Sequence, residues 1–296
     1  MRARLAWRAD FRHTGAVQPI FVGDVQGCDD EFAELLARAE AHYGSEFELW
    51  SVGDLINRGP ENRRPLARVR ELEERGRARV VIGNHEMSLL RCWLGLREVS
   101  EFDSFQDLLD APDADEWMEW IRSRQLACIG KLGRQPFAMV HASVDPSWSL
   151  ADVERAAHEV QERMRAPIPE LRRFLREDAD PRDDLLGRLT RARSVGPNGR
   201  WSAEEPTGRE RPWHAAWAEH GHDYGVVYGH WAMQSLHVAP GLRGLDTGCV
   251  HHGRGRAGAL TAWIPDPARE RPFDLPDDRF WSIPARRAYY AHRDAR

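Results

Sequence analysis

The stretch FVGDVQGCDDEF, residues 21–32, indicates the fold class of this chain. An apolar run ends abruptly at Gly23 and Asp24, and an acidic, helix-like segment follows, which is typical of a buried strand that turns into a helix. Two later runs, FELWSVGD and ARVVIGN, end in the same way. The segments between the three runs, residues 29–44 and 62–76, have apolar residues three and four positions apart, and each finishes in a glycine. This alternation of strands and helices predicts an α/β sheet with parallel strands.

Three more apolar runs also end in polar turns: PFAMVH, GVVYGH and RGLDTG. Ligands of open α/β sheets collect beyond the carboxyl ends of the strands. We therefore expect the polar residues that follow these six runs to form one site.

Composition excludes some classes of function. The chain has 296 residues, of which 42% are hydrophobic and 30% charged, and its net charge of −5 argues against extended nucleic-acid binding. An anionic small molecule remains a possible substrate if arginines or metal ions concentrate positive charge locally. We find no membrane-spanning run and no secretion signal, and the four cysteines form no C-x-x-C pair. A cytoplasmic, reduced location is expected.

We expect residues 1–296 to form a single domain. Residues 100–130 are helical by pattern and acidic, and residues 150–225 are rich in arginine, tryptophan and proline. Both segments are predicted to be insertions that cap one edge of the site. The tail from about residue 266 is expected to wrap the surface.

Five polar residues that follow strand-like runs are hard or borderline metal ligands: Asp24, Asp54, Asn84, His141 and His230. One such Asp is usually only a turn residue, but the set has the composition that two divalent ions about 3.5–4 Å apart require. The sequence therefore predicts a binuclear metal site.

The motifs also resemble a known superfamily. GDVQG, GDLINRG and GNHE are similar to the three signature blocks of the PPP-type, calcineurin-like metallophosphoesterases, and the histidines of VH (140–141) and YGH (228–230) to two later metal ligands. GDLINRGP, TRAR and GLDTGC resemble one branch, the symmetrical bis(5′-nucleosyl)-tetraphosphatases. The resemblance covers roughly residues 18–265. It implies a four-layer α/β/β/α sandwich, here with helical cap insertions.

The resemblance also implies roles for individual residues. The metal ligands would be Asp24, Gln26 and Asp54 for the first ion, and Asp54, Asn84, His141 and His230 for the second. Mn²⁺ is the expected ion, with Mg²⁺, Co²⁺ and Fe as alternatives. His85 would be the general acid, Asn57 would orient it, and Arg58 would bind a phosphate. We favour Arg191 and Arg193 as a second phosphate clamp, because arginine offers bidentate hydrogen bonds to phosphate oxygens.

The implied reaction is the cleavage of diadenosine tetraphosphate, or of related dinucleoside polyphosphates, into two nucleoside diphosphates. Water that the two ions acidify would attack one phosphorus. RNA 5′ ends with the same linkage are an additional candidate substrate. Two alternatives stay open: a Ser/Thr or Tyr protein phosphatase on the same core, and a nucleotide-binding sensor with reduced turnover.

Two positions depart from the usual blocks of the superfamily. Gln26 replaces a His, and its neutral amide oxygen suits harder ions such as Mn²⁺, so we expect a more weakly held first metal. Asn57 stands where protein phosphatases usually have Asp. Asn can accept a hydrogen bond from the His85 ring but brings no charge. A leaving nucleoside diphosphate, with a pKa of roughly 6, needs little protonation. Asn57 therefore favours an anhydride substrate.

The run VHHGRGRAG is longer than in the family, and it contains His251 and His252. These histidines could face the substrate, but we expect them at the surface.

Overall fold

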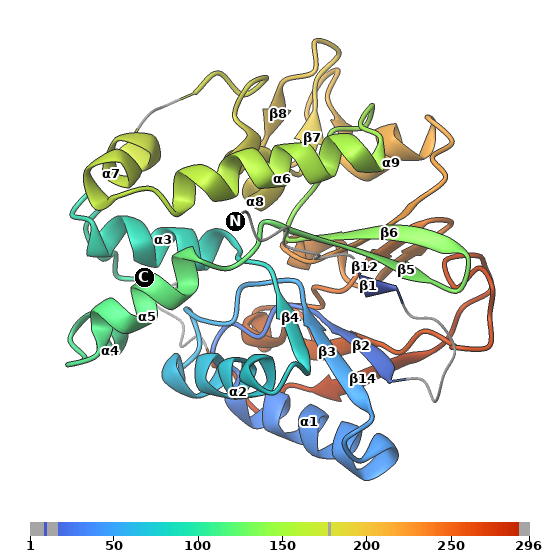
Figure 1. Ribbon diagram of the computed structural model, residues 1–296, viewed down its shortest axis with the longest axis horizontal. Coiled ribbons are helices and arrows are strands. Elements are labelled where there is room, and N and C mark those ends of the chain that lie inside the picture. The colour runs from blue at the N-terminus through green and yellow to red at the C-terminus, as the bar shows by residue number, and fades with distance from the viewer. Residues whose placement is uncertain (1–8, 11–16, 177–178, 290–296) are drawn as a thin grey trace, which may run out of the picture.

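The computed structural model describes residues 9–10, 17–176 and 179–289, and its core is two stacked β-sheets (Figure 1). The strands of the five-stranded sheet are, in spatial order, β14 (Phe280–Pro284), β13 (Ala259–Trp263), β2 (Gln18–Val22), β3 (Phe47–Ser51) and β4 (Ala78–Val80). Strands β2, β3 and β4 are parallel, as the sequence predicts. Their residues are buried almost throughout because both faces of the sheet are covered.

The second sheet has six strands. Its spatial order is β1 (Ala9–Asp10), β5 (Ala127–Leu132), β6 (Gln135–Val140), β10 (Gly225–Tyr228), β12 (Leu242–Gly244) and β11 (His237–Ala239). Strands β6, β10 and β12 are parallel, so their carboxyl ends point the same way. These three strands are the late apolar runs predicted from the sequence.

Aromatic side chains fill the space between the two sheets. Phe21 of β2 lies 5.4 Å from Trp50 of β3 and 5.3 Å from Phe137 of β6, measured between ring centroids. All three rings are fully buried. They hold the two sheets face to face, which brings the carboxyl ends of β2 and β3 next to those of β6 and β10.

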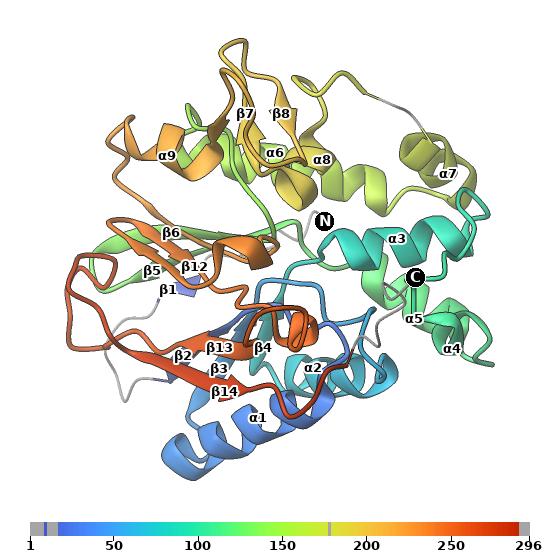
Figure 2. The ribbon, with the colours of Figure 1, turned by 180° about the vertical axis from the view of Figure 1, so that it is seen from behind.

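Helices cover both outer faces of the sheet pair (Figures 1 and 2). Helices α1 (Asp29–Tyr43) and α2 (Arg63–Glu74) cover the five-stranded sheet, while α6 (Leu150–Met164), α8 (Leu185–Arg191) and α9 (Trp213–Ala218) lie over the six-stranded sheet. Helix α3 (Asn84–Trp93) begins at the sheet edge and extends to one end of the molecule. The predicted α/β/β/α sandwich is confirmed. No helix in the described part of the chain is long and apolar enough to cross a membrane.

The two segments expected to be insertions contain more of the core than the sequence indicated. Residues 100–130 form α4 (Gln106–Leu109) and α5 (Ala114–Arg122) but also the first half of strand β5. Residues 150–225 include α6, which packs on β5 and β6 and is part of an outer layer. Beyond α6 come α7 (Ile168–Arg176) and a small sheet of β7 (Ser194–Val195), β8 (Trp201–Ser202) and β9 (Arg211–Pro212).

The tail does more than wrap the surface. Its strand β14 forms the edge of the five-stranded sheet, and its Phe273 is fully buried against Trp263. The carboxylate of Asp277 accepts hydrogen bonds from Arg243 Nε at 2.9 Å and Trp263 Nε1 at 2.8 Å. The sequence did not reveal these contacts, because Arg, Asp, Ala and Pro make up most of the tail and its core residues are few.

Candidate active site

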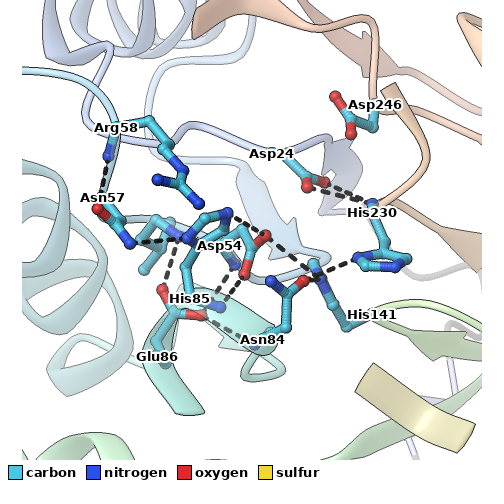
Figure 3. A network of polar contacts seen from close by, with 12 residues as sticks. Asp24, Asp54, Asn57, Arg58, Asn84, His85, Glu86, His141, His230 and Asp246 are labelled. Atoms are coloured by element: carbon cyan, nitrogen blue, oxygen red, sulfur yellow. Dashed lines mark hydrogen bonds and ion pairs between the residues drawn. The ribbon is translucent and has the colours of Figure 1, made fainter. Parts of the chain in front are cut away.

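The structure brings together the predicted polar residues at the carboxyl ends of strands from both sheets. Asp24 follows β2, Asp54 follows β3, and Asn84 opens α3 just after β4. His141 follows β6 and His230 follows β10. Figure 3 shows their side chains pointing toward one another.

Backbone strain is concentrated in these turns. Among the described residues, six non-glycine residues have a positive φ, and five of them are predicted site residues: Gln26, Asp54, Asn57, Arg58 and His230. Such conformations cost free energy and persist only where the surrounding structure enforces them. Their clustering marks this region as functional.

Asp54 is the central carboxylate. It is 1% exposed, its Oδ1 accepts a hydrogen bond from the His85 backbone N–H at 2.9 Å, and its Oδ2 lies 3.4 Å from His141 Nε2. Burial alone would raise the pKa of Asp54, but the neighbouring His141 and His85 hold it below its usual range. Asp54 is therefore ionised and available as a ligand.

His141 and His230 direct nitrogen lone pairs toward the same atom, Asn84 Oδ1. His141 Nδ1 donates to the carbonyl oxygen of Val52 at 2.8 Å, and His230 Nε2 donates to that of Arg191 at 2.9 Å. Because a carbonyl only accepts, the other nitrogen of each neutral ring has no hydrogen. These nitrogens lie 3.1 Å and 2.8 Å from Asn84 Oδ1, which is itself an acceptor.

This arrangement fits a metal ion. The ligand atoms of Asp54, His141 and His230 all lie within 4.8 Å of one another. Electron-pair donors converge there, and backbone carbonyls fix the tautomers of both rings, as is usual around bound metals. The Asp54 carboxylate, which raises the pKa of His141 against the effect of burial, would attract a divalent cation in the same way.

Several buried carboxylates lie close together where the first metal ion is predicted. Both oxygens of Asp24 accept from the His230 backbone N–H at 3.1 Å. Burial raises the pKa of Asp24, and the charges of Asp246 and Asp54 raise it further. Asp246 is also buried, with its pKa raised to about 6 by burial and by Asp54. Three buried carboxylates that repel one another favour a bound cation. Gln26, 5% exposed, lines the same cavity.

His85 is hydrogen-bonded to Asn57, but the donor and the acceptor are the reverse of those expected. Asn57 Oδ1 accepts from the backbone N–H groups of Arg58 at 2.8 Å and Ser104 at 2.9 Å. Its Nδ2 therefore faces His85 Nδ1 at 2.9 Å and donates to it. The prediction that Asn57 accepts from the ring was wrong, because the backbone of its own turn and of the 100–104 loop fixes the amide.

The predicted phosphate-binding arginines separate into two groups. Arg58 and Arg193 line the cavity together with several of the predicted metal ligands. Arg58 also donates to the Phe102 carbonyl at 2.6 Å, and Arg193 to that of Ala203 at 2.7 Å. The Arg191 guanidinium lies in a neighbouring hollow of about 220 Å³ with Trp201. Its side chain does not line the site cavity, and it is the Arg191 carbonyl that contacts the site, through His230.

Three functional candidates were not assigned from the sequence. Glu86 accepts from the N–H groups of Asp54, Leu55 and Gly83 at 2.8–3.0 Å and so fixes two of the turns. Its position in GNHE was a usable signal. The others are Asp246 in LDTG and Asp103, whose Oδ1 accepts from Asn57 Nδ2 at 2.9 Å. His251 lines the cavity instead of lying at the surface.

Comparisons with known proteins identify a family for this chain. The model of the calcineurin-like phosphoesterase family matches residues 19–234. A relative from Janthinobacterium sp. (strain Marseille), named a symmetrical bis(5′-nucleosyl)-tetraphosphatase, is 36% identical over 259 residues, which cover 81% of this chain and 92% of that protein. One from Vibrio cholerae serotype O1 with the same name is 34% identical and covers 78% and 91%.

Solved structures show the same fold. A crystal structure provisionally assigned as a diadenosine tetraphosphatase has a TM-score of 0.57 at 23% identity and covers 94% of this chain and 97% of that one. A Saccharomyces cerevisiae protein serine/threonine phosphatase has a TM-score of 0.55 at 14% identity and covers 94% and 82%. At these identities the structures support the fold alone.

Proposed function

This chain belongs to the calcineurin-like phosphoesterases and, within them, to the symmetrical bis(5′-nucleosyl)-tetraphosphatases, and we propose that it hydrolyses diadenosine tetraphosphate to two molecules of ADP. The observation that carries the proposal is the metal-ligand geometry: two histidines, each fixed by a backbone carbonyl, direct their lone pairs at Asn84 and Asp54. The relatives' shared name supports the choice of substrate.

The proposed ligands could hold two divalent ions. Asp24, Gln26 and Asp54 would hold the first, and Asp54, Asn84, His141 and His230 the second. When bound, such ions acidify water and neutralise phosphate charge. We propose Mn²⁺, with Mg²⁺, Co²⁺ and Fe as alternatives, because the mixture of carboxylate, amide and imidazole donors suits ions of intermediate hardness.

The remaining residues bind substrate and assist the departing group. His85 faces the cavity, and we propose that it donates a hydrogen bond from Nε2 to the leaving oxygen. Asn57 fixes the ring that does so. Arg58 and Arg193 lie on the cavity wall, where each can bind a phosphate oxygen. The Arg191 side chain is not part of the proposed clamp, because it lines the neighbouring hollow.

The cavity favours a small phosphoanhydride over a phosphoprotein. Its volume is about 450 Å³, and a hydrogen bond to the Phe102 carbonyl holds Arg58 at its wall. A protein phosphatase needs room for a folded or extended peptide at the metal site. The sensor alternative predicts bound nucleotide without turnover, although the full ligand set argues for catalysis. Capped RNA 5′ ends remain an additional proposed substrate, and a cytoplasmic location remains part of the proposal.

The test runs two reactions in parallel with purified protein and Mn²⁺. One contains diadenosine tetraphosphate and the other a phosphoserine peptide, and chromatography measures the products. Turnover of the dinucleotide with little or none of the peptide supports the proposal. Phosphate release from the peptide alone would replace it with the protein phosphatase. Bound nucleotide without products would favour the sensor.

A further inference from the structure

The site cavity is lined by two chemically different kinds of residue. Proposed metal ligands and four arginines line the same cavity. Those arginines come from three separate segments. Arg58 follows β3, Arg193 precedes β7, and Arg254 and Arg256 belong to the 249–258 loop.

The loop has a defined conformation. It begins with the short helix η2 (Cys249–His251), the Gly253 N–H donates to the Arg256 carbonyl at 3.1 Å, and the Gly258 N–H donates to His252 Nδ1 at 3.1 Å. The Arg256 guanidinium donates to the Ala232 carbonyl and, at 3.2 Å, to Ser235 Oγ, which ties the loop to the segment at η1 (Ala232–Gln234). The loop therefore loses little conformational entropy when a ligand binds to it.

The positive charges of the loop face the same volume as the predicted active-site residues. His251 is mostly buried beside them, and its pKa is lowered to about 4 by burial and by the charges of Arg254, Arg256, His85 and Arg58. Arg254 itself is exposed at the cavity rim. The charges of Arg254 and His85 both act on His251, so the three residues lie near one another along the cavity wall.

We propose that Arg254 binds the outer phosphates of the substrate, those beyond the phosphate that is attacked. The identity of that substrate rests on the proposed function. A tetraphosphate bridge is longer than a single phosphate and carries several negative charges, so a chain held at the metal ligands extends toward the rim. The Arg254 guanidinium can meet it there with paired hydrogen bonds. The loop therefore sets a preference for long phosphate chains over monophosphates.

The test compares two substrates in the wild type and in Arg254→Gln. Diadenosine tetraphosphate reaches the rim, whereas p-nitrophenyl phosphate occupies only the metal end. Loss of a charged hydrogen bond should lower kcat/KM for the dinucleotide by roughly tenfold or more and affect the aryl phosphate much less. Arg134→Gln is the matched control, because Arg134 is 77% exposed and does not line the cavity. An equal loss on both substrates, or none on either, would overturn the proposal.

A second arm separates this inference from the proposed function. Inorganic tripolyphosphate is titrated as an inhibitor of p-nitrophenyl phosphate hydrolysis in the wild type and in Arg254→Gln. We expect its inhibition constant to rise by roughly tenfold in the variant, and an unchanged constant would contradict the role of Arg254. If the wild type hydrolyses the aryl phosphate but not the dinucleotide, the proposed function fails. The inhibition constant of tripolyphosphate still shows whether Arg254 binds a phosphate chain.

Discussion

Asn57 donates a hydrogen bond from Nδ2 to Nδ1 of His85 across 2.9 Å. The ring therefore accepts at Nδ1, and its proton is on Nε2, which lies 3.7 Å from Asp54 Oδ2. Burial lowers the pKa of His85, and the charge of Arg58 lowers it further, although Asp54 opposes both. His85 is thus a neutral hydrogen-bond donor near pH 7. Such a group suits a leaving phosphate, which departs as a stable anion, better than a leaving alkoxide.

Replacement of His85 by Ala should therefore affect substrates unequally. We expect kcat/KM for phenyl phosphate, whose leaving phenol has a pKa of about 10, to fall by roughly 100-fold or more. The loss for diadenosine tetraphosphate should be at least several-fold smaller. Steady-state kinetics on both substrates with Mn²⁺ measures the difference, and equal losses would sink this account of the Asn57–His85 pair.

Replacement of Gln26 by His should strengthen metal binding. Gln26 has a φ of 46°, a region that His tolerates better than most residues. An imidazole is a better ligand than an amide for ions of intermediate hardness. We expect the weaker Mn²⁺ site to tighten by about tenfold, the scale typical of changes around a metal ligand. Calorimetric titration of metal-free protein measures this, and identical isotherms for both proteins would count against Gln26 as a ligand.

The tail should contribute strongly to stability through one buried ion pair. Arg243 is fully buried, and its Nη2 lies 2.8 Å from Asp277 Oδ2. Arg243→Met leaves the Asp277 carboxylate buried without its cation, which costs about 3–5 kcal/mol. Urea unfolding measures the free energy of unfolding. Arg271→Met, on an exposed pair with Asp274, is the control and should cost under about 1 kcal/mol. Similar small losses in both variants would refute the role of Asp277.

His214 should make the fold sensitive to acid. Burial and the charge of His237 lower its pKa to about 4, and Gln234 Nε2 lies 2.7 Å from its Nε2. Between pH 6.5 and pH 4 the unfolded chain binds a proton there that the folded chain does not. This group therefore contributes stability above pH 6.5 that is lost as the pH falls toward 4. His214→Phe should reduce the drop in unfolding free energy between pH 7 and pH 4.5, and an unchanged drop would contradict the assignment.

The sequence predicted those site residues that lie directly after a strand. Asp24, Asp54, Asn84, His141 and His230 could be placed together because each follows a buried strand, and parallel strands end at the same edge of a sheet. This grouping depends on local pattern and on general rules of topology, whereas the four layers followed from the family resemblance.

Side-chain direction and long-range contacts could not be predicted in this way. Arg191 and Arg193 are two residues apart, yet α8 ends at the first and an extended segment follows, so only Arg193 faces the site cavity. The direction of the Asn57 amide depends on Ser104, which is 47 residues away. Strand β14 was missed because the strand it pairs with, β13, was also not revealed by the sequence pattern.

Hydrolysis of adenosine guanosine tetraphosphate tests the central claim most directly. This substrate has a different base at each end, so the products report which bond is cleaved. Chromatography after reaction with Mn²⁺ should show ADP and GDP in equal amounts and no other nucleotides. AMP with GTP, or ATP with GMP, would contradict symmetrical cleavage at this site.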